Sequence, residues 1–266
     1  MELLEQLLNK KYMIQNIKLN DKPTKLRIVI QTNRNEKIWI QVKDSKRKNT
    51  YYTKRYAFID GTATFMVLMP QAPTEASIVV VNDANGLLRV DNSFKVLEIT
   101  PLPYDLPKPN FSKKTQSFVK FVQEFCDECG YLSSSTKGDI YKSDNGRFRI
   151  DYFNAIVNLN TGKTIKTPAR ISQLSGKIEV SADQFRTFTI PMRMAILLHE
   201  YSHYYLNKNP SNEVEADVNG LNIYLRLGYP KIDVYNVFLN VFKTSPTEQN
   251  KERFKVLDKM VKKFRA

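Results

Sequence analysis

The sequence predicts an α+β protein in which an antiparallel β-sandwich-like domain precedes a domain of mixed helices and strands. Apolar and polar residues alternate through residues 12–100, as in strands with one buried face. The segment TPLPYDLPKPN, residues 100–110, then holds four prolines, and helical periodicity follows it. We therefore expect a β-rich domain over residues 1–100, a linker over 101–110 and a second domain over 111–266.

The alternation is clearest in KLRIVIQT and EKIWIQVKD. Every second residue of a strand lies on the same face, so each run predicts one apolar face. The residues expected on these faces are Leu26, Ile28, Ile30, Ile38, Ile40 and Val42. Turn residues in DKP, TNRNE and MPQAP separate these runs from further ones, a spacing typical of a sandwich or barrel. A short amphipathic helix over residues 2–10 is expected before the strands.

The second domain is expected to open with a helix, because apolar residues recur there at helical spacing. These residues are Phe118, Phe121, Val122 and Phe125. Asn145-Gly146 predicts a tight turn, followed by strands at RFRIDYF and AIVNLN. TIKTPARIS and GKIEVSADQF continue the sheet.

Three helices are expected after this sheet. The first begins near Pro191. Asn209-Pro210 pairs an N-cap residue with proline at the first helical position, and predicts a second helix that runs to about Leu227. Ser245 has Glu248 three residues later, the spacing of a capping box, and predicts the start of the last helix.

The formal net charge is +14, and it is concentrated near the two ends of the sequence. Residues 1–56 hold 14 Lys and Arg against 5 Asp and Glu. A basic balance suits nucleic acid, an acidic partner or an anionic membrane surface, and a solvated surface is the plain alternative. The segment KDSKRKNTYYTKRY interleaves bases with tyrosines, which suits base stacking as well as a solvent-facing hairpin. Nucleic-acid binding stays open but is not favoured.

No apolar run approaches the roughly 20 residues that span a bilayer, so no membrane span is expected. The start, MELLEQLLNKK, lacks the features of a secretory signal, which predicts a cytoplasmic protein. Cys126 and Cys129 form a single CxxC near the end of the first helix of the second domain. Because redox-active CxxC motifs open a helix rather than close one, we expect two reduced thiols.

The only two histidines of the chain, His199 and His203, lie four residues apart in ILLHEYSHYYLN. On a helix this spacing places both imidazoles on one face, where they can share one Zn²⁺. Glu200 follows the first histidine, which completes the HExxH pattern of two ligands and a general base. The alternative is a pair of helix-surface histidines that bind no metal.

A catalytic zinc site needs a third protein ligand, and no further histidine is present. The segment SNEVEADVNG offers Glu213, Glu215 and Asp217. On a helix Glu213 and Asp217 share a face, whereas Glu215 lies about 200° round from Glu213. We expect Glu213 as a ligand and Asp217 as the acceptor of an imidazole N–H. The alternative is that these acids have no ligand role and only stabilise the first turns of a helix, where negative charge is favourable.

HEYSH followed by NEVEAD resembles the gluzincin metallopeptidases, and is similar to their prenyl-protein-processing and phage-repressor-cleaving members. The resemblance covers about residues 111–266 and is sharp between 196 and 220. It implies a zincin-like fold and a zinc-dependent endopeptidase that acts on a peptide or protein substrate. It also implies the roles of the site residues: His199, His203 and Glu213 bind Zn²⁺, Glu200 is the general base and Asp217 orients His199.

In such folds a strand lies antiparallel to the substrate, and GKIEVS, residues 176–181, is the segment expected there. Gly220 stands where relatives usually have alanine, and either residue is expected to allow close helix packing. SPTEQNKERF is similar to a late segment of the prenyl-processing group. Many relatives stabilise the oxyanion with a third histidine, which this chain lacks. Tyr152, Tyr224 and Arg226 are the side-chain candidates for that task.

The resemblance to phage-associated peptidases also motivates a second hypothesis. The chain could be a structural component of a large assembly, such as a phage virion, with other subunits as its partners. Zinc would then be structural or vestigial. Glu200 discriminates between the two hypotheses, because a purely structural zinc site has no need of a general base.

Overall fold

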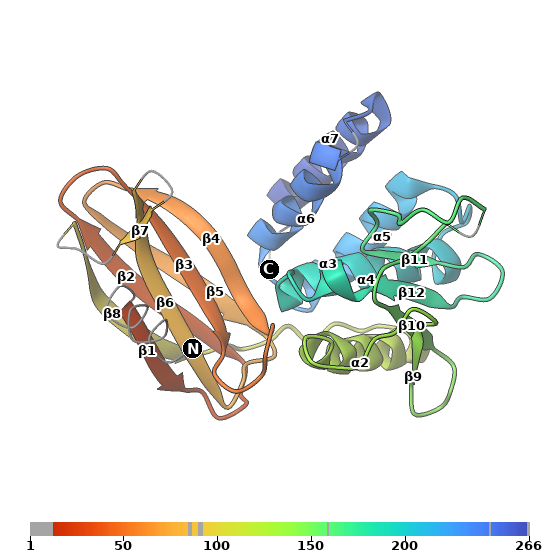
Figure 1. Ribbon diagram of the computed structural model, residues 1–266, viewed down its shortest axis with the longest axis horizontal. Helices are drawn as coiled ribbons and strands as arrows, with labels where there is room; N and C mark the ends of the chain where they lie inside the picture. Colours follow the sequence, from red (N-terminus) through yellow and green to blue (C-terminus); the bar gives the residue numbers. More distant parts are fainter. Residues whose placement is uncertain (1–12, 85–86, 90–92, 159, 245, 265–266) are drawn as a thin grey trace. The chain divides into compact units, whose positions relative to one another are not determined.

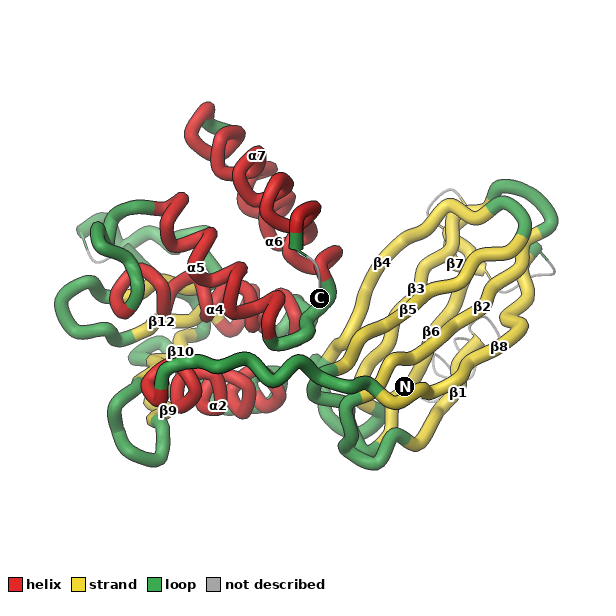
Figure 2. The backbone as a smooth tube through the Cα atoms, turned by 180° about the vertical axis from the view of Figure 1, so that it is seen from behind, coloured by secondary structure: helices red, strands yellow, loops and turns green. Residues whose placement is uncertain are grey.

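The computed structural model describes residues 13–84, 87–89, 93–158, 160–244 and 246–264. The chain divides into two compact units, Met1–Leu106 and Pro107–Ala266 (Figure 1). The division falls inside the proline-rich segment that predicted a linker. The helix expected over residues 2–10 lies outside the described residues. Every described helix belongs to the second unit, whereas strands occur in both (Figure 2). The predicted α+β class is thereby confirmed.

Two antiparallel sheets build the first unit. One has the strand order β1-β6-β3-β4, with β7 also paired to β6, and the other has the order β5-β2-β8. The strands of the first sheet are β1 (Met13–Lys18), β3 (Glu36–Asp44), β4 (Tyr51–Ile59), β6 (Glu75–Ala84) and β7 (Leu87–Arg89). Those of the second are β2 (Thr24–Thr32), β5 (Thr62–Met69) and β8 (Phe94–Pro103).

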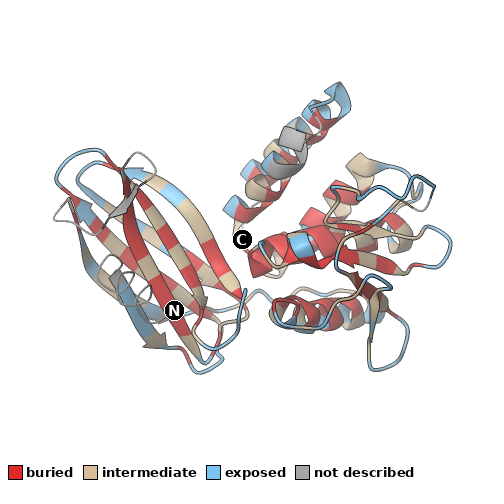
Figure 3. Ribbon diagram, viewed as in Figure 1, coloured by how far each residue is buried: buried red, intermediate tan, exposed pale blue. Residues whose placement is uncertain are grey.

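The apolar faces predicted for the first unit are its core. All six residues expected there are completely buried, and along β2 and β3 buried positions alternate mostly with half-buried ones (Figure 3). The alternation arises because successive side chains of a strand point to opposite faces. The prediction of the linker start at residue 101 was wrong, since β8 continues to Pro103. Proline is tolerated there because β8 is an edge strand of its sheet.

The sheet of the second unit has the order β11-β12-β10-β9. Its strands are β9 (Asp139–Lys142), β10 (Arg149–Phe153), β11 (Ala169–Ile171) and β12 (Ile178–Ser181), and β10 pairs parallel with β12. Gly146, at a φ of 66°, makes the turn between β9 and β10 that Asn145-Gly146 predicted. The strand predicted at AIVNLN does not form in its described residues. Asn158 instead accepts hydrogen bonds that close a turn, and Val157 makes a single bridge with Thr164.

Helices α2 (Lys113–Glu128), α3 (Ala182–Phe185), α4 (Ile190–Tyr205), α5 (Glu213–Arg226), α6 (Lys231–Thr244) and α7 (Glu248–Lys263) complete the second unit. The four residues predicted to give α2 its apolar face are all buried. Helix α4 lies at the centre, in contact with α2, α5, α6 and β11. Thr189 caps it, and Pro191 stands in its first turn, as predicted. No described helix is both long and apolar enough to cross a membrane.

Helices α5 and α7 are capped by residues other than those predicted. Helix α5 begins three residues later than Asn209-Pro210 predicted: Asn212 is its N-cap and accepts the N–H of Glu215 at 3.0 Å. Residues 209–212 form a turn instead, closed by a bond from the Asn212 N–H to the Asn209 carbonyl. Ser245, the predicted cap of the last helix, lies outside the described residues. Thr247 caps α7.

Cys126 and Cys129 are free thiols and completely buried at the end of α2. Burial raises the pKa of both thiols, that of Cys129 to about 11, so both stay protonated near neutral pH. The buried guanidinium of Arg193 donates to the carbonyl of Cys126 and to that of Phe185, both at 2.8 Å. It ties α4 to α2 and α3. The interpretation of the CxxC as structural thiols agrees with this burial.

Candidate metal centre

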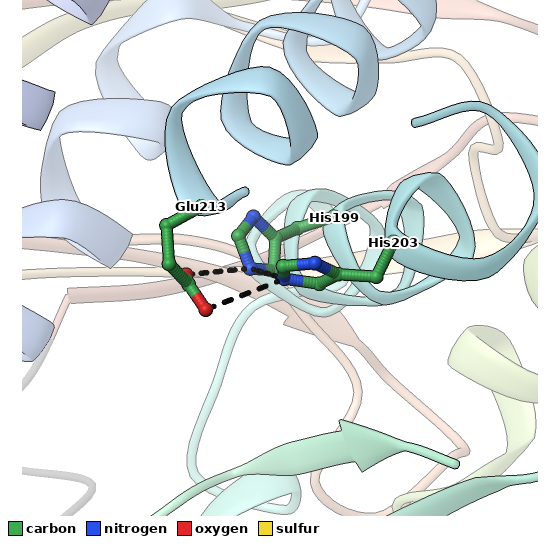
Figure 4. Close-up of side chains that lie close together, drawn as sticks. All are labelled: His199, His203 and Glu213. Carbon is green, nitrogen blue, oxygen red and sulfur yellow. Dashed lines mark hydrogen bonds and ion pairs between the residues drawn. The ribbon is translucent and has the colours of Figure 1, made fainter. Parts of the chain in front are cut away.

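Helices α4 and α5 bring three side chains together at one point. His199 and His203 project from one face of α4, and Glu213 is the first residue of α5 (Figure 4). The Nε2 atoms of the two imidazoles are 3.0 Å apart. The Glu213 carboxylate oxygens lie 3.5 Å from Nε2 of His199 and 3.6 Å from Nε2 of His203. The three residues predicted as ligands thus form one cluster whose ligand atoms all lie within 4.8 Å of one another.

The second nitrogen of each imidazole is already engaged. Nδ1 of His199 lies 2.8 Å from Oδ1 of Asp217, and Nδ1 of His203 lies 2.7 Å from the carbonyl oxygen of Pro210. A carbonyl oxygen only accepts hydrogen bonds, so Nδ1 of His203 is the protonated nitrogen. In the neutral imidazoles both Nε2 atoms then carry lone pairs, and these face each other and a carboxylate. Only a cation or a proton satisfies such a set of acceptors.

The spacing of the donors fits a zinc ion. A tetrahedral ion with bonds of about 2.0–2.1 Å holds its ligand atoms about 3.3 Å apart. The two Nε2 atoms are 3.0 Å apart, and each lies within 3.6 Å of a different carboxylate oxygen of Glu213, so the separations are close to that value. Two imidazole nitrogens and a carboxylate oxygen are also a donor set that zinc accepts. The donor types and their separations are therefore compatible with zinc, while the identity of the metal stays a prediction.

Gly220 sets the distance between the two helices that carry the ligands. A Cβ added there would lie 2.9 Å from the backbone nitrogen of His199 and 3.0 Å from its Cα. Contacts of this length with backbone atoms force a displacement. The expectation that alanine is also small enough was therefore wrong for this chain, because α5 lies directly against the backbone of α4 at the first histidine.

Arg253 completes the centre, and sequence reasoning missed it. Its guanidinium donates to both oxygens of Asp217 at 2.6 and 2.9 Å, and lies 3.1 Å from Glu213. A signal for it existed in the sequence. Asn250, Arg253, Leu257 and Val261 recur at spacings of three and four on the buried face of α7, so an arginine stands on an otherwise inward stripe. Such a position predicts a buried partner of opposite charge.

The contacts keep both carboxylates ionised. Hydrogen bonding to His199 lowers the pKa of Glu213 to about 2, against the effect of burial. Burial raises the pKa of Asp217, but hydrogen bonds to His199 and Arg253 outweigh it and lower the pKa. Burial lowers the pKa of His199, yet its bonds to Asp217 and Glu213 raise it to about 10. The centre thus holds a positive charge tightly, either as a proton on an imidazole or as a metal that replaces it.

Glu200 stands beside the cluster and faces the edge of the sheet. Burial raises its pKa to about 7, while His199 and a hydrogen bond from the backbone of Ile171 act in the opposite direction. Ile171 ends β11, which is an edge strand. Residues 176–181 were predicted to border the substrate as an edge strand, but β12 lies between β11 and β10 and is not an edge. The edge strand beside Glu200 is β11, which lies within the predicted segment TIKTPARIS.

A pocket of about 390 Å³ opens beside these groups. Its polar lining includes His199, Glu200, His203, Glu213, Asp217 and Arg253, and residues 167–171 also line it. Apolar lining comes from Ala195, Ile196, Leu221, Val234, Val237 and Phe238 on α4, α5 and α6. A single pocket thus joins the candidate metal centre to an edge strand and to apolar side chains.

The three candidates for oxyanion stabilisation differ in position. Tyr152 is completely buried and donates to the Cys129 carbonyl at 2.7 Å, away from the pocket. The Arg226 guanidinium lies over the ring of Phe111 and is absent from the pocket lining. Tyr224 does line the pocket, but its hydroxyl donates to the carbonyl of Pro230 at 2.9 Å. Of the three, only Tyr224 is near the predicted chemistry, and it is already engaged.

Comparisons with known proteins give no further information on this centre. No protein-family model matches the chain, and no curated protein matches its sequence.

Proposed function

We propose that this protein is a zinc-dependent endopeptidase of the gluzincin type. The observation that carries the proposal is the cluster of His199, His203 and Glu213 beside Glu200, in one pocket that an edge strand borders. A structural zinc site is usually closed by four protein ligands, whereas a catalytic one has three. This site has three proposed ligands, a carboxylate next to them and an accessible pocket. Together these features support a catalytic role better than a structural one.

Each residue of the site has a different role in the proposed peptide hydrolysis. His199, His203 and Glu213 would hold Zn²⁺, which supplies Lewis acidity that polarises a carbonyl and lowers the pKa of water. Glu200 accepts the proton of the attacking water and delivers it to the leaving amine. Asp217 accepts the Nδ1–H of His199 and fixes that imidazole with Nε2 toward the cluster. Arg253 holds Asp217 with two hydrogen bonds, so it is a positioning residue.

The pocket also suggests how a substrate binds. Strand β11 pairs with β12 on one side only, so an extended peptide can add to its other side as a further strand. That placement puts the peptide backbone beside Glu200, which lies next to Ile171. A Leu-sized or Phe-sized side chain next to the scissile bond would then contact the apolar residues that line the pocket. We therefore expect unfolded or extended segments with such residues as substrates.

Cleavage of a peptide library by the zinc-loaded protein, compared with its Glu200→Gln variant, tests the proposal. Loss of the general base should lower kcat/KM by about 10²–10⁴-fold. Zinc content should stay the same, because Glu200 is not a ligand. Glu215→Gln is the matched control, since that acid lies on α5 and hydrogen-bonds the backbone N–H of Lys208.

Equal cleavage by the wild type and the Glu200→Gln variant would mean that a contaminating peptidase is at work. Retained zinc with no cleavage of any library member would instead support the alternative that the chain is a structural component of an assembly, such as a phage virion.

A further inference from the structure

The solvent side of the β3–β4 hairpin carries a regular set of aromatic and basic side chains. The register places Lys43 opposite Tyr51, Gln41 opposite Lys54, Trp39 opposite Tyr56 and Lys37 opposite Phe58. We call these eight residues the hairpin face. All eight are partly or fully exposed, and β4 is an edge strand of its sheet. Successive rows on one face of a strand are about 6.6 Å apart.

Two aromatic side chains of the hairpin face are largely exposed to solvent. Phe58 is 74% exposed and Tyr56 is 51% exposed. The Trp39 and Tyr56 rings are in contact, with centroids 4.6 Å apart. Lysines lie over two of the rings, Lys37 over Tyr56 at 4.2 Å and Lys54 over Tyr51 at 3.3 Å. Rings and positive charges therefore alternate on one accessible surface.

The charge that the hairpin exposes is positive. Residues 36–59 hold seven Lys and Arg against two acids, Glu36 and Asp44, and both acids are buried. Asp44 accepts the backbone N–H groups of Lys46 and Arg47, which shapes the loop that exposes residues 46–48. One further acid, the buried Asp83 of β6, pairs with Lys37 at 2.7 Å. Arg47 lies 3.7 Å from Asp44. The outer surface of the hairpin is thus basic, with Lys37 and Arg47 partly neutralised.

From this combination we propose that the hairpin face binds single-stranded nucleic acid. Exposed bases stack on aromatic rings, and lysines along the same track neutralise the phosphates. A duplex keeps its bases stacked inside and would engage only the lysines. An acidic peptide would satisfy the charges but would leave Tyr56 and Phe58 without planar partners. The proposal concerns the first unit and is independent of the peptidase proposal.

The chain has a built-in reporter for this binding, since Trp39 is its only tryptophan. We would titrate the full chain with a 12-nucleotide oligothymidylate and follow the emission of Trp39, which should be quenched in a saturable way. Phe58→Ala and Tyr56→Ala should each weaken binding about fivefold or more. Replacing Lys43 and Lys54 by glutamine should reduce the slope of log affinity against log salt by about 0.7 per lysine.

Matched controls come from β8 in the other sheet, where Leu97→Ala and Lys95→Gln remove exposed side chains of similar kind. Both should leave the affinity unchanged. Phe58 is largely exposed, so its removal should also leave the melting temperature unchanged. Absence of quenching would overturn the proposal. Wild-type affinity in the two aromatic variants, or equally tight binding of duplex DNA or polyglutamate, would overturn it as well and would point to a general polyanion surface.

Discussion

The two units differ in how they bury charged residues. The first unit has apolar faces between its sheets, as in the runs that contain Ile28 and Ile40, and its buried acids lie on β3 and β6. The second unit also has an apolar core, but there the buried His203, Asp217 and Arg253 lie together at the candidate metal centre. Burying charge costs stability unless every group is paired. The buried charged cluster of the second unit therefore indicates a site, whereas the apolar cores of both units stabilise the fold.

The largest expected effect tests whether the two interiors are separate. Ile40→Ala leaves a cavity in the core of the first unit, and should lower the free energy of unfolding of that unit by about 2–5 kcal/mol. The zinc content of the second unit should stay unchanged, because all three proposed ligands belong to the second unit. Chemical denaturation followed by Trp39 emission measures the loss. Leu97→Ala, at a 46% exposed position, is the control and should cost little. Loss of zinc in Ile40→Ala would show that the core of the first unit and the metal site of the second are coupled.

Gly220→Ala probes the helix contact of the second unit. The added Cβ would lie 2.9 Å from the His199 backbone, so α4 and α5 must separate. Overpacking of this kind costs about 1–3 kcal/mol. Because the ligands come from both helices, zinc affinity should also fall. Calorimetry with and without zinc measures both effects, with the exposed Asn222→Ala on α5 as the control. Unchanged stability and affinity would contradict the close approach of the helices.

Asp217→Asn should give a smaller and more specific effect. The neutral amide accepts the Nδ1–H of His199 less strongly than the carboxylate does. It also cannot form the ion pair that Asp217 makes with Arg253. Loss of such an orienting group typically lowers metal affinity 10- to 100-fold, about 1.4–2.7 kcal/mol. Competition with a zinc-binding dye measures it. Asp183→Asn, in the short helix α3 and outside the pocket lining, should leave the affinity unchanged. Wild-type affinity in Asp217→Asn would contradict the orienting role.

The two interiors also differ in how far the sequence predicts them. Alternation predicted the buried faces of the first unit residue by residue, because period-two patterning determines which side of a strand is buried. In the second unit the spacing of His199, His203, Glu213 and Asp217 predicted a cluster, because residues four apart on a helix share a face. The first prediction depends on local periodicity alone, whereas the second also depended on the third ligand that a catalytic zinc needs and on the resemblance of the motif.

Features that depend on tertiary contacts escaped prediction. Strand β11 lies within the predicted segment TIKTPARIS, but the order of strands in a sheet depends on tertiary contacts, so the edge position was assigned to β12 instead. The Pro210 carbonyl bonds to His203, and the turn that holds it delays the start of α5. Arg253 is remote in sequence from the residues that it holds. Each of these positions is determined by a partner far along the chain or by a turn that the dipeptide signal did not distinguish from a helix start.

The zinc content of the purified protein shows whether His199, His203 and Glu213 bind a metal. Elemental analysis of the purified wild type should give about one zinc per chain, and Glu213→Ala should lose it while Glu215→Ala keeps it, because only the first of these acids faces the two imidazoles. That result would establish the three residues as a metal site. Absence of zinc from the wild type after zinc supplementation, or equal zinc in both variants, would contradict the account.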